Sequence, residues 1–297
     1  MSYAVLAPRL RAGRPLVVDA DPGASLRAQG MTLGSPGALG ALLRHQPESV
    51  SAHHASETAR RVDVLSALTA DTTPRALAEV GMEHRSAMLT GQAVDLAYEI
   101  AHASERPVAV AAVLGSDLVT SLDRRRFEAE TREHALRISV AGPELVIVRG
   151  MGSAAELGFA VQATSDLGLP SWAVVDLELS GEHLEDLLET LTEAGAEAVL
   201  FETPTIELAL DRLARVAQWE MRIAPGVLLA AGDDAVRGFP AELEPGWVER
   251  ALELVDAGAR IVGGGAGTTA AHSQALAAAL RQLHPSIAPL TGTASVG

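Results

Sequence analysis

The sequence contains eight short apolar runs, separated along the chain by stretches with helical periodicity or by turn residues. The runs do not alternate between apolar and polar residues, which is typical of strands that are buried on both faces and pair in parallel. Helices between parallel strands then cover the sheet. The eight runs are residues 16–19, 62–65, 107–114, 145–149, 171–176, 196–201, 226–230 and 260–262.

Eight strand–helix units in a chain of 297 residues predict an α/β protein built as a single (β/α)8 TIM barrel. A pair of flavodoxin- or Rossmann-type domains with doubly wound sheets is the alternative, but no Pro/Ser-rich linker divides the chain. We expect the barrel to span residues 1–284. Residues 285–297 are rich in Pro, Ser, Thr and Gly, and we expect them to form a flexible C-terminal tail.

Cys, Lys and Asn are absent from the sequence, so all 23 basic residues are arginine. Without Cys there is no disulfide, thiolate nucleophile or cysteine-bound metal, and without Lys there is no Schiff base or Walker-type phosphate site. The net charge of −15 argues against nucleic acid or an anionic membrane as a partner. No run of about 18 apolar residues predicts a membrane span and no secretory signal is visible, so we expect a soluble cytoplasmic protein.

Ligands of parallel barrels bind at the carboxyl ends of the strands. The polar residues that follow the predicted strands are Asp19, Asp71, Ser116, Asp117, Arg149, Asp176, Glu202, Asp233 and Asp234. Asp19 is placed either to orient a ligand amine or to cap a turn.

A glycine-dense loop, Gly263–Gly267, follows the last predicted strand, and a helix is expected to begin near residues 268–270. Glycines let a ligand approach the backbone closely, and the free N–H groups of a helix N-terminus can bind a phosphate or carboxylate. The alternative is that the loop only closes the last turn of the barrel. Asp233 and Asp234 would repel a phosphate. The loop alone therefore does not decide between anion binding and simple closure of the turn.

Several of these segments resemble the homocysteine S-methyltransferase family, zinc-dependent barrels that include the homocysteine module of cobalamin-dependent methionine synthase and betaine–homocysteine methyltransferase. The resemblance is most specific at residues 263–272, where G-G-G-A-G-T-T-A-A-H is similar to the family pattern G-G-C-C-G-T-T-P-x-H. Residues 17–23 resemble the opening strand and turn of the family. Residues 47–54 and 62–65 resemble its P-e-x-V…H segment and its second strand.

The chain departs from the family at the catalytic positions. Gly265 and Ala266 stand where the resemblance implies two zinc-binding cysteines, and Glu202 stands where it implies the third. Arg149 replaces the glutamate that holds the substrate amino group, and Ala20 replaces a glycine that helps to hold the substrate. The resemblance implies zinc, but one carboxylate without soft ligands cannot form the tetrahedral site that activates a thiol. We therefore predict no metal site and no cofactor.

These departures predict a homocysteine S-methyltransferase-like protein that has lost zinc-dependent methyl transfer to homocysteine. The resemblance implies that a small amino acid or thioether could still bind at the barrel mouth. The substrate-binding set expected for it is Asp19, Ala20, Arg149, Glu202, Gly264, Gly265 and Ala266. Two alternatives stay open: a non-catalytic scaffold or partner subunit, and a metal-free enzyme that acts on a small anionic or zwitterionic substrate.

Arg149 and Glu202 follow the fourth and sixth strands, whose inward side chains occupy the same layer or adjacent layers of a barrel. An Arg–Glu pair would restore the charge balance that a lost cation disturbs, so we predict that their tips lie within a Debye length, roughly 8 Å. We expect His53 and His54 on a solvated helix face, and His272 in a structural hydrogen bond within the last helix.

Overall fold

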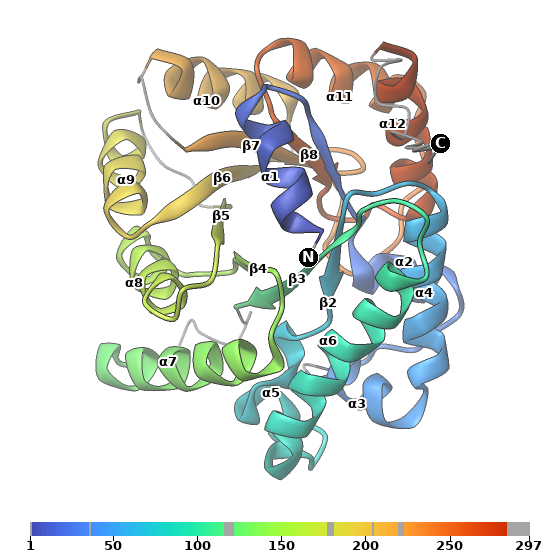
Figure 1. Cartoon of the computed structure of the whole chain (residues 1–297), viewed down its shortest axis with the longest axis vertical. Coiled ribbons are helices and arrows are strands. Elements are labelled where there is room, and N and C mark those ends of the chain that lie inside the picture. The colour runs from blue at the N-terminus through green and yellow to red at the C-terminus, as the bar shows by residue number, and fades with distance from the viewer. Residues whose placement is uncertain are drawn as a thin grey trace, which may run out of the picture.

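The computed structural model describes residues 2–35, 37–115, 122–176, 181–203, 205–218 and 223–283. Within these ranges, eight parallel strands form one closed barrel in sequence order, and β1 closes the ring by pairing with β8 (Figure 1). The strands are β1 (Leu16–Val18), β2 (Val64–Ala67), β3 (Ala109–Leu114), β4 (Leu145–Val148), β5 (Ser171–Val175), β6 (Ala196–Thr203), β7 (Ala224–Leu229) and β8 (Ile261–Gly264). The predicted TIM barrel is confirmed, and the alternative of two doubly wound domains is wrong.

Helices surround the barrel in Figure 1, and none in the described ranges is long and apolar enough to cross a membrane. They are α1 (Tyr3–Arg11), α2 (Pro22–Ala28), α3 (Ala38–His45), α4 (Pro47–Ala59), η1 (Ala70–Thr72), α5 (Pro74–Ala78), η2 (Glu83–Arg85), α6 (Ser86–His102), α7 (Arg124–Ala141), α8 (Ala154–Ser165), α9 (Gly181–Glu193), α10 (Ile206–Gln218), α11 (Trp247–Asp256) and α12 (Ala270–Leu283). The predicted tail, Ser116 and Asp117 lie outside the described residues.

The barrel interior is filled by alternate residues of the strands, and α1 closes one end of it. Leu16 and Val18 of β1 belong to the interior cluster, whereas Val17 between them packs in the outer layer. Leu6 and Leu10 of α1 join the interior cluster, and Figure 1 shows α1 lying over the barrel centre. Because α1 covers one end of the barrel, the carboxyl ends of the strands form its open end.

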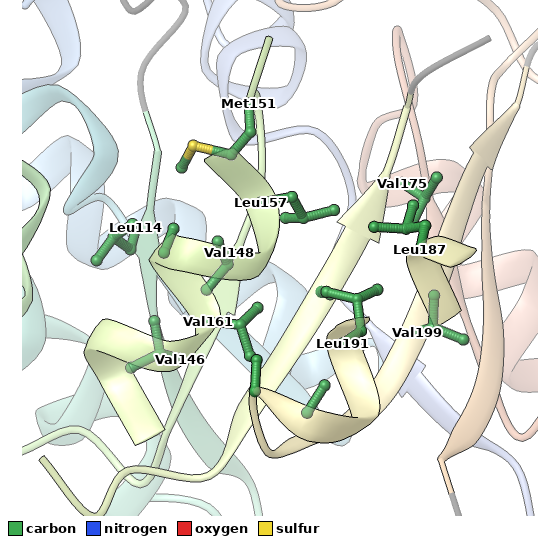
Figure 2. Packing of buried hydrophobic residues seen from close by; sticks show 14 of the residues in the cluster. Leu114, Val146, Val148, Met151, Leu157, Val161, Val175, Leu187, Leu191 and Val199 are labelled. Atoms are coloured by element: carbon green, nitrogen blue, oxygen red, sulfur yellow. The ribbon is translucent and has the colours of Figure 1, made fainter. Parts of the chain in front are cut away.

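The outer layer is mostly aliphatic and holds the strands against the helices. In Figure 2, Val161 of α8 and Leu187 and Leu191 of α9 pack beside the strands that carry Val148 and Val175. All five side chains are buried. Because such an interior is close-packed, it fixes the strand ends, and with them the polar side chains that follow the strands.

Asp63 links α1 to the barrel, at the end opposite the carboxyl ends of the strands. One carboxylate oxygen accepts a bond from Arg9 Nη1 at 2.8 Å, and the other accepts the buried N–H of Val17 at 3.0 Å. Arg106 lies 3.6 Å from the same carboxylate. Asp63 therefore links α1, β1 and the start of β2 through one buried carboxylate.

We predict that Asp63→Ala lowers the free energy of unfolding by about 2 kcal/mol, because it leaves the Val17 N–H buried without an acceptor. Urea unfolding at neutral pH measures the change. Asp95→Ala, at an exposed position of α6, is the matched control and should change stability by less than about 0.5 kcal/mol. Equal effects of the two substitutions would contradict this account of Asp63.

Candidate functional site at the barrel mouth

A cavity of about 470 Å³ opens at the carboxyl ends of the strands. Charged side chains line part of its wall, namely Asp19, Asp21, Arg27, Asp71, Arg149, Asp176 and Arg237. Apolar side chains line another part, and they include Leu33, Ala38, Leu39, Leu68 and Val113. The cavity therefore presents charges of both signs together with an apolar surface.

The predicted binding residues divide into two groups. Asp19, Ala20, Arg149 and Gly264 lie on the cavity wall. Glu202, Gly265 and Ala266 are not part of that wall, although they belong to the strand and loop around it.

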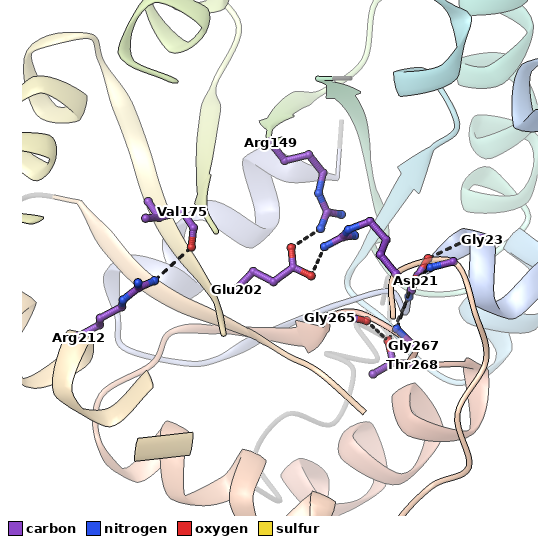
Figure 3. A network of polar contacts seen from close by, with 11 residues as sticks. Asp21, Gly23, Arg149, Val175, Glu202, Arg212, Gly265, Gly267 and Thr268 are labelled. Carbon is purple, nitrogen blue, oxygen red and sulfur yellow. Dashed lines mark hydrogen bonds and ion pairs between the residues drawn. The ribbon is translucent and has the colours of Figure 1, made fainter. Parts of the chain in front are cut away.

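The predicted ion pair between Arg149 and Glu202 is confirmed. Arg149 Nη2 lies 2.5 Å from Glu202 Oε2, and a second guanidinium, that of Arg237, bonds to Glu202 Oε1. Figure 3 shows the Glu202 carboxylate at the centre of this group, with a dashed contact from each of its oxygens. The Glu202 side chain is only 8% exposed. Each of its oxygens is therefore bonded to an arginine instead of being solvated by water.

The electrostatics of this group keep all three charges in place. Burial disfavours the Glu202 carboxylate, but Arg149 and Arg237 outweigh burial and lower its pKa. Burial likewise opposes the charge of Arg149, but Glu202, Asp21 and Asp176 outweigh it and raise the pKa of the guanidinium. The group therefore has a net charge of +1 at neutral pH.

Arg237 comes from the β7–α11 loop (residues 230–246), and the sequence analysis missed it. The loop is fixed at the mouth by further contacts beside the ion pair. The N–H of Gly238 donates to Asp21 Oδ2 at 2.6 Å, and Arg27 Nη1 donates to the Gly238 carbonyl at 2.6 Å. The Arg27 guanidinium also lies 4.3 Å from the centre of the Phe239 ring. No local sequence signal marks a loop arginine that bonds to a residue on another strand.

Asp21 joins three segments of the mouth and was also missed. It is the N-cap of α2, and its Oδ1 accepts the N–H groups of Gly23 and Ala24. Its Oδ2 accepts the N–H groups of Gly238 and Gly267, and Figure 3 shows Asp21 beside Gly267. Pro22 and Gly23, which were expected in a turn, instead begin α2. A signal was present, because an Asp followed by Pro is typical of an N-cap and the first helical residue.

N–H groups of the glycine loop and of the residues after it are bonded to other parts of the protein. Gly265 donates to the carbonyl of Leu229, Gly267 to Asp21, and Thr269 to His272 Nδ1. Thr268 Oγ1 also donates to the Gly265 carbonyl at 2.8 Å. These contacts favour the interpretation that the loop closes the barrel over the one in which it binds an anion. The structural role expected for His272 is confirmed.

Asp19 is buried and hydrogen-bonded at the end of β1. The N–H and hydroxyl of Ser66 donate to its two oxygens at 2.7 and 2.6 Å. Burial and, after it, the nearby charge of Glu57 raise the pKa of Asp19 to about 7, and the hydrogen bonds from Ser66 oppose this rise.

The expectation that His53 and His54 lie on a solvated helix face is wrong. Both are 0% exposed, because α4 packs against α2, α3, α6 and α12. Burial lowers the pKa of His53 to about 4 and that of His54 to about 3, so both rings are neutral at physiological pH.

The residues at the family's zinc positions do not fit a zinc ion. A Cβ at Gly265 would lie 2.7 Å from the carbonyl oxygen of Leu228 and 3.0 Å from the N of Ala230, so the backbone leaves no room for a cysteine there. Both oxygens of Glu202 are bonded to arginines. Among the described residues, no three His, Cys, Asp or Glu side chains are grouped to hold a metal ion.

The model of the family described as homocysteine S-methyltransferase matches residues 16–280. The chain belongs to the homocysteine S-methyltransferase family. No curated protein matches the chain in sequence.

Several solved structures are similar to the chain in fold. The metallated form of the homocysteine methyltransferase MmuM from Escherichia coli is 19% identical, covers 92% of this chain and 99% of its own, and has a TM-score of 0.79. Its apo form is 20% identical with a TM-score of 0.72, over 92% and 98% of the two chains. The 3-dehydroquinate dehydratase from Geobacillus kaustophilus HTA426 is 12% identical, with a TM-score of 0.53 over 91% and 92%. At these identities the likeness shows the fold.

We predict that returning the three family cysteines, as Glu202→Cys, Gly265→Cys and Ala266→Cys together, does not create a stoichiometric zinc site. The Gly265 position has no room for a Cβ, and removal of Glu202 leaves two guanidinium groups to repel a cation. Elemental analysis after dialysis against zinc gives the metal content, and thermal unfolding gives the stability. Ala266→Cys alone is the control. A triple variant that holds one zinc per chain at wild-type stability would contradict the prediction.

Proposed function

We propose that the chain binds a small zwitterionic molecule of the amino-acid or thioether class at the barrel mouth, and that guanidinium groups hold it instead of zinc. The observation that carries the proposal is the arrangement of the ion group. Arg149 and Arg237 both line the cavity, while Glu202 stands behind them and is not part of the cavity wall. Each arginine uses its Nη2 for Glu202, and a guanidinium has five N–H donors in all.

A carboxylate is the group that such donors suit best. Two guanidinium groups share the one Glu202 carboxylate, so each keeps N–H donors that a ligand carboxylate can use, although Asp21 and Asp176 also act on Arg149. Planar guanidinium and carboxylate groups can also form paired hydrogen bonds. Glu202 positions the two arginines for this contact and prevents them from repelling each other.

The remaining walls suit an ammonium group and an apolar tail. Asp19 and Asp176 supply negative charge on the cavity wall, and Leu33, Leu39 and Leu68 supply an apolar surface. A ligand with a carboxylate, an ammonium group and a short unbranched apolar or thioether tail matches all three features. Without a soft metal site to hold a thiolate, the chemistry we propose for this chain differs from zinc-dependent methylation of homocysteine.

We expect methionine, homocysteine or S-methylmethionine to raise the melting temperature of the metal-free protein. A ligand at about 100 times its Kd stabilises the folded state by about 2.7 kcal/mol. The amine that methionine gives on loss of its carboxylate should stabilise far less, because it cannot contact the arginines. A thermal-shift titration measures both effects.

Arg149→Met and Arg237→Met should each weaken binding by about ten-fold or more, equivalent to about 1.4 kcal/mol. Arg260→Met removes an exposed arginine that does not line the cavity, and it should leave the affinity unchanged. If none of the three amino acids stabilises the wild-type protein, the proposal is wrong and the scaffold alternative is favoured.

A further inference from the structure

A cluster of buried polar groups lies next to Asp19, and no part of the proposed function uses it. Three of its members, His53, His54 and Glu57, come from α4 and are 0% exposed. The hydroxyls of Ser25 in α2 and Ser273 in α12 are buried as well. In the described part of the chain, none of the ring nitrogens, carboxylate oxygens or hydroxyls of these five side chains has a hydrogen-bond partner. Buried polar groups without partners are rare in native proteins, so each needs a physical explanation.

Glu57 is the member that is hardest to bury as an ion. Burial raises its pKa, and the hydroxyl of Ser273, the backbone N–H of Ala20 and the charge of Arg60 offset this rise only in part. The first two do not reach its oxygens with hydrogen-bond geometry. Within the described ranges, no arginine lies at ion-pair distance from Glu57. An isolated carboxylate in such a site is neutralised by a proton.

The other titratable groups around Glu57 do not supply a positive charge. His53 and His54, on its own helix, are held neutral by burial. The negative charge of Asp21 opposes the fall in the pKa of His53. The Asp21 oxygens themselves are bonded to backbone N–H groups. Asp19, from the end of β1, interacts with Glu57 as a like charge.

Asp19 and Glu57 therefore form a pair of buried acids with unequal surroundings. Asp19 accepts two hydrogen bonds from Ser66, which stabilise its ionised form. Glu57 accepts none of comparable geometry. Two buried carboxylates that interact strongly titrate as a pair, and the less solvated one retains the proton.

We propose that Glu57 carries a proton at neutral pH and, with Asp19 as its neighbouring acid, makes the barrel mouth an acid–base site as well as a binding site. Asp19 faces the ligand cavity, and Glu57 serves as the internal proton carrier behind it. The surrounding serines and neutral histidines can form hydrogen bonds, as donors or as acceptors, with protonated Glu57 and with bound water.

The pair predicts a proton exchange when a ligand binds, and this part of the inference rests on the proposed function. An ammonium group placed beside Asp19 stabilises the state in which both acids are ionised. The O–H bond of the protonated carboxyl then breaks, and the proton leaves to the buffer. Ligand binding is thereby coupled to the release of up to one proton.

Infrared spectroscopy tests the proton without any ligand. At pH 7 the wild-type protein should show the carbonyl band of a buried protonated carboxyl group. Glu57→Gln should remove the larger part of the band, whereas Asp19→Asn should keep it, because Glu57 remains buried. The double variant should remove the band completely, since Asp19 is itself a buried acid with a raised pKa. Absence of the band in the wild type, or a band of unchanged strength in Glu57→Gln, would overturn the proposal.

The pH dependence of stability gives a second readout without ligand. A proton bound more tightly in the folded state contributes stability that is full below the unfolded-state pKa and is lost as the pH rises through the folded-state value, which is about 7 for Asp19. Glu57→Gln should therefore gain in melting temperature relative to the wild type as the pH rises from about 5 to about 8. Glu99→Gln, at an exposed position of α6, should run parallel to the wild type. A Glu57→Gln profile parallel to that of the wild type would contradict the proton on Glu57.

Calorimetry with L-methionine separates this inference from the proposed function. Titrations in phosphate and in Tris buffer, which differ in ionisation enthalpy, give the number of protons released on binding. We expect release by the wild type at pH 7 and less by Glu57→Gln, in which only Asp19 can still lose a proton. Binding without proton release would overturn the coupling while leaving the proposed function intact. No binding would overturn the proposed function, and the infrared band would still decide whether Glu57 holds a proton.

Discussion

The barrel mouth depends on the ion group formed by Arg149, Glu202 and Arg237. A carboxylate that is only 8% exposed at the end of β6 must be neutralised, and here two guanidinium groups neutralise it. One arginine comes from the end of β4 and the other from the β7–α11 loop, so the same interaction closes the mouth and shapes its wall. Removing Glu202 would leave two guanidinium groups without their shared acceptor, and removing either arginine would leave one Glu202 oxygen without its donor. The three positions are therefore best understood as one unit.

The rest of the mouth is organised around that group. Arg237 brings the β7–α11 loop over the cavity, and Asp21 holds both this loop and the glycine loop through their N–H groups. The chain therefore shares the family's barrel while its mouth has different donors. A shared fold does not imply a shared reaction, and here the side chains at the strand ends are the relevant guide to chemistry.

The barrel could be predicted because eight apolar runs recur along the chain, and this pattern does not depend on any single residue. The sequence also predicted the Arg149–Glu202 contact, since both residues follow strands of the same parity. It did not predict Arg237, whose role depends on the path of a loop. The burial of His53 and His54 was missed because α4 is rich in small and polar residues and lacks an apolar face. Packing against α2, α3, α6 and α12 buries the face of α4 that carries the two histidines.

The central claim is that guanidinium groups have taken the place of zinc at this barrel mouth. The most direct test measures the metal content and the homocysteine methyltransferase activity of the same protein, purified and assayed with zinc supplied. Our account predicts far less than one zinc per chain and no zinc-dependent methylation of homocysteine. One tightly bound zinc per chain together with methylation of homocysteine would contradict it.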